Sequence, residues 1–253
     1  MTTSVMVNSS RLVSPTFTCD AADFDGTNDY MSRGALSGAV DSKKGLLSAW
    51  IRLDGGDGTF QVVFLGEISS GADRFYLLRA DTNKFQLIAS NASGTAILSL
   101  VTSSTYTTST TWLNVLSSWD LATAGARHLY VNGVSDMVVN TFTDDTIDYT
   151  LDNFYVSNSG SGNLVNGALA ELYFSSGQYL DLSDAGNRSK FISGSGKAVN
   201  LNADGSRPTG GIPLVYLHLD HLESAANFAT NRGSGGDFSI TGSLDTASTS
   251  PSD

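Results

Sequence analysis

Hydrophobic and polar residues alternate with a period of two along much of this chain. In residues 47–53, Leu, Ala, Ile and Leu alternate with Ser, Trp and Arg. This alternation is typical of a strand with one buried face. Other short segments rich in apolar or β-branched residues predict further strands at 62–65, 74–80, 84–89, 113–117, 128–131, 154–156, 169–174, 212–219 and 237–241.

Turn residues separate these segments, which recur about every 10 to 15 residues. Asp81-Thr82-Asn83 predicts a hairpin between two of them. Asn132-Gly133 predicts a second, because both central positions of a type I′ turn need a positive φ. The pattern therefore predicts an all-β fold, a sandwich of two antiparallel sheets.

One segment, residues 182–192, indicates a helix instead. Ser183 can serve as its N-cap, and Phe191 and Ile192 can turn inward near its end. Gly186 and Asn187 are weak helix formers, so we expect this helix to be short.

Composition narrows the class of protein. A chain of 253 residues suits one large β domain, or one domain with a small appendage. The net charge of −11 disfavours a nucleic-acid partner and an anionic membrane surface. Cys19 is the single cysteine, so no intrachain disulfide forms and we expect a buried free thiol. The first 14 residues do not resemble a signal peptide and no 18-residue apolar run occurs, which predicts cytoplasmic synthesis without membrane insertion.

Four phrases, in a fixed order, carry a resemblance to a known family. They are FDGTNDY at 24–30, LLSAWI at 46–51, RHLYVNG at 127–133 and GALAELY at 167–173. Together they resemble the laminin-G-like branch of the concanavalin A-like lectin/glucanase superfamily, over roughly residues 20–185. The resemblance implies a jelly-roll sandwich. We divide the chain into an N-terminal arm or first strand (1–19), the sandwich (20–193), C-terminal strands that complete or decorate it (194–245) and a flexible tail (246–253).

The run LNADGSRPTGGIPLVYL at 201–217 resembles a phrase of bacteriophage structural proteins that carry this domain. It implies a virion structural protein: a decoration, neck or tail-associated module on the particle exterior. Its partners would be other virion proteins, copies of itself and, in an adhesive role, a host glycan. The alternative is a free-standing carbohydrate-binding lectin or a degenerate glycanase.

Catalytic residues are the next question, since the superfamily includes glucanases. Retaining glycoside hydrolysis needs two carboxyl groups about 5 Å apart, which alternate positions of one strand can supply. Glu171 has no such partner, because Tyr173 and Ser175 occupy the next positions on its face. The sequence therefore predicts a protein that is not an enzyme. The resemblance implies that Glu171 caps backbone amides near the Asp25-Gly26 turn.

Calcium is the cofactor that the resemblance implies, since many sandwich lectins of this superfamily use it. Asp23, Asp25, Asn28 and Asp29 offer oxygen ligands within one turn, with Glu171 as a fifth. The alternative is that residues 25–29 form Asx-type turns that fix the hairpin.

Zinc is less favoured, although His218, Asp220, His221 and Glu223 are ligand types at close spacing. Strand alternation places His218 and Asp220 on one face and His221 on the other.

Carbohydrate contact is the remaining chemistry, because sugars stack on aromatic rings and hydrogen-bond to polar side chains in loops. Trp119 is a candidate because it precedes Asp120 and the loop 121–127, where relatives carry Tyr-Asp. We predict a carbohydrate site at Trp119, Asp120 and Tyr149. The alternative is that Trp119 packs beneath that loop.

Overall fold

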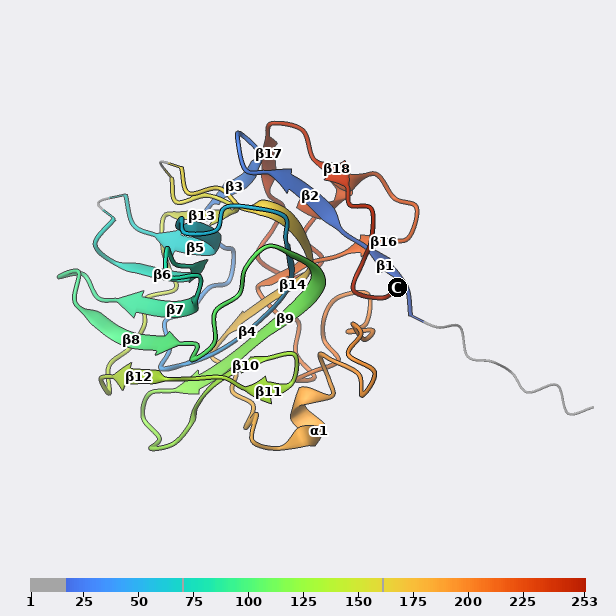
Figure 1. The fold of residues 1–253 in the computed structure, drawn as a ribbon. Helices are drawn as coiled ribbons and strands as arrows, with labels where there is room; N and C mark the ends of the chain where they lie inside the picture. Colours follow the sequence, from blue (N-terminus) through green and yellow to red (C-terminus); the bar gives the residue numbers. More distant parts are fainter. Residues whose placement is uncertain (1–16, 70, 161) are drawn as a thin grey trace, which may run out of the picture.

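Two eight-stranded antiparallel sheets form the molecule in the computed structural model, which describes residues 17–69, 71–160 and 162–253 (Figure 1). We name each sheet after a central strand. The β14 sheet has the order β11 (Val134–Ser135), β10 (Arg127–Val131), β9 (Ser109–Asp120), β4 (Lys44–Leu53), β14 (Asn166–Ser176), β2 (Ala22–Asp25) and β18 (Asp245–Thr246), with β15 (Val215–Leu217) also paired to β14.

The β6 sheet faces it across the core. Its order is β12 (Val139–Phe142), β8 (Ala96–Val101), β7 (Phe85–Ser90), β6 (Arg74–Arg79), β5 (Gln61–Glu67), β13 (Asn153–Val156), β3 (Tyr30–Gly34) and β17 (Ser239–Thr241). A short ladder joins β1 (Cys19–Asp20) to β16 (Leu219–Asp220). The predicted all-β sandwich of two antiparallel sheets is therefore confirmed.

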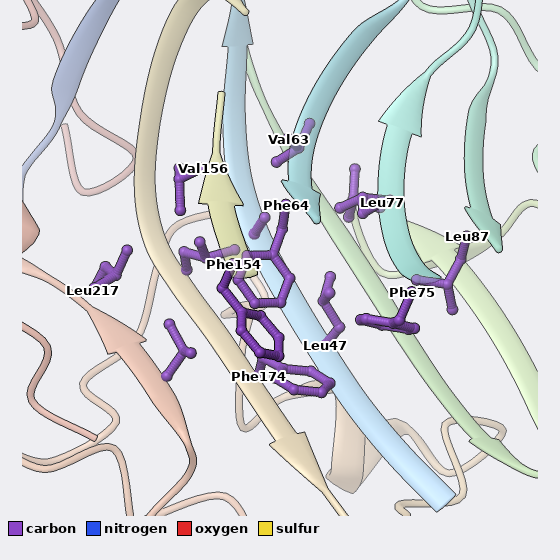
Figure 2. Packing of buried hydrophobic residues seen from close by; sticks show 14 of the residues in the cluster. Leu47, Val63, Phe64, Phe75, Leu77, Leu87, Phe154, Val156, Phe174 and Leu217 are labelled. Atoms are coloured by element: carbon purple, nitrogen blue, oxygen red, sulfur yellow. The ribbon is translucent and has the colours of Figure 1, made fainter. Parts of the chain in front are cut away.

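Period-two alternation produces the core between the sheets. Leu47 of β4 and Phe174 of β14 meet Phe64 and Phe75 of the opposite sheet (Figure 2). The rings of Phe75 and Phe174 are stacked with their centroids 5.1 Å apart. Each fully buried side chain of this kind contributes about 1.5–3 kcal/mol to folding.

The outer face of the β14 sheet is covered as well. Tyr173 and Leu46 on that face pack against Leu182, Phe191 and Leu201 of the C-terminal segment. Burial on both faces explains why β4 shows no exposed position after Lys44, whereas β6 alternates over its first residues. The C-terminal segment thus completes the hydrophobic core of the domain.

The predicted helix at 182–192 is shorter in the structure, where α1 spans Ala185–Arg188. Its N-cap is Asp184 rather than Ser183, and the Asp184 carboxylate accepts a hydrogen bond from Gly186 N at 2.8 Å. Gly186 and Asn187 have low helix propensity, which explains why the helix is short. One 3₁₀ helix, η1, spans Ala225–Ala229. Among the described residues, no helix is long and apolar enough to cross a membrane.

The tail at 246–253, expected to be flexible, packs against the first strands. Ala247 N donates to Ala21 O at 2.9 Å, and Ala198 N donates to Pro251 O at 2.9 Å. The hydroxyl of Ser252 bonds both the N–H and the carbonyl of Cys19. Serine-rich composition indicated flexibility, but the hydroxyls form hydrogen bonds with backbone and side-chain groups instead. Residues 1–16 of the expected N-terminal arm lie outside the described residues.

Candidate functional site

Glu171 lies at an irregularity in β14, on the face covered by the C-terminal segment. The pairing of β14 with β4 shifts register between Ala170 and Tyr173, and Glu171 has a positive φ of 48°. Positive φ is uncommon for a residue other than glycine and costs about 1–3 kcal/mol. The bulge aims the Glu171 carboxylate at the neighbouring strand β15, because an extra residue bends a strand locally.

Two aromatic side chains hold this carboxylate. The Tyr216 hydroxyl of β15 donates to Glu171 Oε2 at 2.8 Å. His218, in the step between β15 and β16, contacts Glu171 Oε1 through Nδ1. Glu171 is only 2% exposed and His218 only 4%. The carboxylate is therefore buried and fully engaged by donors, as a buried charge requires.

The chain of charges continues to the surface through His218. Its Nε2 lies 2.9 Å from Asp220 Oδ1, and Arg232 donates to Asp220 Oδ2 at 2.6 Å. We call Glu171, Tyr216, His218, Asp220 and Arg232 the Glu171 network. When His218 is protonated, its positive charge lies between the negative charges of Glu171 and Asp220, and Asp220 also contacts the positive charge of Arg232. Each charge in the network therefore has an opposite charge beside it.

Burial alone lowers the pKa of His218, but the hydrogen bonds and charges of Glu171 and Asp220 outweigh it and raise that pKa. Arg232, then His218, hold the pKa of Asp220 below its usual range. Burial, followed by the charge of Glu171, raises the pKa of Tyr216. The environment therefore keeps both carboxylates paired with donors and Tyr216 neutral.

A cavity of about 340 Å³ opens beside the network. Its walls include Phe17, Asn200, Asn202, His218 and Arg232. The Phe17 ring stacks on His218 with centroids 5.8 Å apart, which screens Glu171 from this opening. Tyr216 and Asp220 line the cavity as well, whereas Glu171 does not.

Of the expected calcium ligands, Asp25 and Asp29 lie in contact within one turn, but Glu171 lies apart from them. The β2–β14 register pairs Asp25 with Asn166, five residues before Glu171 and therefore about 17 Å along the strand. Asp23 contacts Arg52, with Oδ1 3.5 Å from a guanidinium nitrogen. Glu171 caps no amide of the Asp25-Gly26 turn, contrary to expectation, because the bulge turns it toward Tyr216 and His218.

The turn at 25–29 shows the Asx-type alternative. Asp25 Oδ1 accepts backbone hydrogen bonds from Thr27, Asn28 and Asp29. These bonds hold the pKa of Asp25 below its usual range. Asp29 Oδ1 accepts from Ser243 N at 2.8 Å. In the part of the chain that the structure describes, no group of three or more His, Cys, Asp or Glu side chains is arranged to hold a metal ion, and calcium binding stays a prediction.

The three residues expected to bind carbohydrate have structural roles. Trp119 and Tyr149 are both 0% exposed, and Trp119 Nε1 donates to the Tyr149 hydroxyl at 3.0 Å. Asp120 accepts from Ala122 N and from Thr123 Oγ1. The structure corrects that expectation, because neither ring offers a face to a sugar. Trp119 belongs to the main core, and its indole N–H is satisfied there.

The Glu171 network was missed at the sequence level, although part of its signal was present. Tyr216, His218 and Asp220 alternate, and alternate residues of a strand share one face. Nothing in the local pattern placed them against Glu171, which precedes them by more than forty residues.

The two facing antiparallel sheets form a sandwich of the kind found in lectins. Comparison with known proteins leads to the same class of fold. Residues 25–181 match the family model described as concanavalin A-like lectin/glucanases superfamily, laminin G type. The chain belongs to this family, as the four phrases indicated. No curated protein matches it in sequence.

Two solved structures show the same fold over 90% of this chain. One is a candidate carbohydrate-binding protein from Bacteroides ovatus, with a TM-score of 0.61 and 14% identity; this chain spans 59% of it. The other is a heptameric SAP-like pentraxin from Limulus polyphemus, with a TM-score of 0.54, 10% identity and 94% of its length covered.

Proposed function

We propose that this chain is a non-enzymatic, carbohydrate-binding component of a bacteriophage particle, presenting its sandwich on the particle exterior. Membership of a lectin superfamily and the likeness to a candidate carbohydrate-binding protein support the binding role. The alternative is a free-standing lectin, or a glycanase that has lost its activity.

The environment of Glu171 is the observation that supports the proposed absence of catalytic activity. A glycosidase needs a second carboxyl group beside the sugar and, in inverting enzymes, a water between the two. The nearest carboxylate in the Glu171 network is Asp220, and the imidazole of His218 fills the space between them. Glu171 is also too deeply buried to meet a substrate.

The segment 201–217 supports the virion part. It carries the phrase that resembles phage structural proteins, and it is integral to the fold through Leu201 and Tyr216, which pack on the β14 sheet. We expect symmetric copies in the particle, because most protein assemblies use repeated interfaces. Other virion proteins and further copies of this chain are the proposed partners.

Quantitative mass spectrometry of purified phage particles, produced from the genome that encodes the chain, tests the virion role. We expect the protein at a fixed ratio to the other particle proteins in every preparation. Recovery in the soluble lysate alone would contradict the virion role and favour the free-standing lectin.

A reducing-sugar assay on β-glucans and other glycans tests the absence of catalysis. We expect no release of sugar by the natural protein. Activity that Glu171→Gln abolished would contradict this proposal, because it would place Glu171 at a reacting centre.

A further inference from the structure

The outer face of the β6 sheet carries a second cluster of side chains, remote in sequence from the Glu171 network. On β5 and β6, alternate residues point away from the core. The register pairs Leu65 with Tyr76 and Glu67 with Arg74. An aromatic ring and two opposite charges therefore lie side by side on this face.

These side chains enclose a cavity of about 180 Å³. That volume equals about six water molecules of liquid, which is room for one sugar ring. Its floor is apolar, formed by Val62, Leu65 and Leu78, which are each 5% exposed or less. Its polar wall is formed by Glu67, Arg74, Ser159 and Asn163.

Aromatic side chains border the opening. Phe60 lines the cavity and is 46% exposed, among the most exposed large apolar residues of the described chain. Tyr76 lines the same cavity and is half-buried. Aromatic rings beside a few convergent polar groups are typical of sites that bind small polar ligands.

We infer that this cavity binds one neutral hexopyranose residue of a glycan, an inference that rests on the proposed carbohydrate-binding function. Phe60 and Tyr76 contact the C–H groups of the sugar ring. The Glu67 carboxylate accepts hydrogen bonds from sugar hydroxyls, and the Arg74 guanidinium donates to them. The cavity thus supplies both the apolar and the polar contacts that a pyranose needs.

Charge favours a neutral sugar over an acidic one. One carboxylate faces one guanidinium in the cavity, so the site itself has no net charge to attract a uronic acid. The whole chain carries −11, which repels polyanions. Burial raises the pKa of Glu67 and the charge of Arg74 opposes that rise, so the carboxylate and the guanidinium lie near each other in the cavity wall.

The experiment compares matched variants of the full-length protein. The natural protein is first applied to an array of glucose, galactose and mannose oligomers, with glucuronate and galacturonate oligomers as the acidic set. The best ligand is then titrated calorimetrically into Phe60→Ala and Glu67→Gln. Phe142→Ala and Glu223→Gln are the controls, since they change an exposed phenylalanine and a partly exposed glutamate outside the cavity.

We expect a neutral oligomer to bind, with a loss of at least about tenfold for both cavity variants and a change within about twofold for both controls. Glu67→Gln keeps the size of the side chain, so circular dichroism should show an unchanged fold. Binding that both cavity variants retain would overturn this site and leave the carbohydrate-binding function standing. A preference for the acidic oligomers would overturn the ligand class. Binding to no glycan would overturn the site and the carbohydrate-binding function together.

Discussion

Glu171 is an acidic residue whose side chain is buried and held by neighbouring side chains. Its backbone is held at positive φ, and its carboxylate is bound by Tyr216 and His218. A buried ion pair adds little net stability over an apolar core, but removing one partner is costly. We therefore expect the Glu171 network to hold the C-terminal segment against β14. Removing one member of the network should lower the free energy of unfolding markedly.

The first prediction concerns His218→Gln. It leaves the buried Glu171 charge without its cationic partner, so we expect a loss of about 3 kcal/mol in the free energy of unfolding at pH 6. The folded pKa of His218 is raised above its unfolded value. The stabilisation by protonated His218 is therefore fully present below the unfolded pKa of about 6.5 and is lost as pH rises through the folded pKa. Urea unfolding from pH 6 to 9 should show the gap between natural protein and variant narrowing.

The control for that measurement is His221→Gln. His221 lies three residues on, with its side chain 58% exposed and 3.0 Å from Asp20. We expect a change within about 0.5 kcal/mol, as for most surface substitutions. Working above pH 5 keeps Asp220 ionised, since its pKa is lowered. A gap for His218→Gln that stayed constant over the whole range would show that His218 does not stabilise as a cation.

Among the elements, β14 is the most constrained, because it pairs with β4, β2 and β15. Gly167 begins its tight pairing with β4. A Cβ at Gly167 would lie 2.0 Å from the carbonyl oxygen of Arg52, and its φ is 153°. The obstacle is backbone, so no side-chain rotation can relieve it.

Gly167→Ala should consequently destabilise the protein by about 3 kcal/mol, the upper end of the usual cost of overpacking. Thermal unfolding followed by circular dichroism measures it. Gly194→Ala is the matched control, because nothing lies within 4 Å of its added Cβ. An equal melting temperature for both variants would mean that β14 can separate locally from β4 without cost.

Elements with a clear alternation were predictable, and those shaped by distant contacts were not. The hairpin at Asn132-Gly133 is confirmed, with φ of 50° and 75° at the two positions. The strand predicted at 212–219 instead breaks at His218, because β15 pairs with β14 while β16 pairs with β1. An apolar run cannot show which partner each part of it takes.

The candidate sites were predicted less well, for the same reason. Trp119 seemed available to a sugar because a polar loop follows it, yet the opposite sheet covers it through Phe75. Glu171 was singled out because its own strand offers no second acid on the same face. Its bulge and its partners depend on the C-terminal segment, which that strand cannot indicate. Burial in a sandwich is decided by the facing sheet, which lies far away in sequence.

At the scale of the whole molecule, the first strands of the described chain pair with strands from its C-terminal part. Strands β1 and β2 pair with β16 and with β18, and the C-terminus lies beside β1 (Figure 1). Phe17 stacks on His218 at the same end. The described contacts at this end include those of Cys19 with Ser252 and of Ala21 with Ala247.

Deleting Met1–Ser14 tests the role of the segment that precedes these strands. If that segment anchors the protein to a neighbouring subunit, its deletion should leave the urea midpoint of the isolated protein unchanged. If the proposed virion role is right and this segment anchors the protein to a neighbouring subunit, the truncated protein should be missing from phage particles. Particle occupancy is measured by mass spectrometry after the truncated gene replaces the natural one, with the full-length gene as control. Full occupancy of the truncated form would exclude anchoring by these residues, and failure of the isolated truncated protein to fold would show that they belong to the sandwich itself.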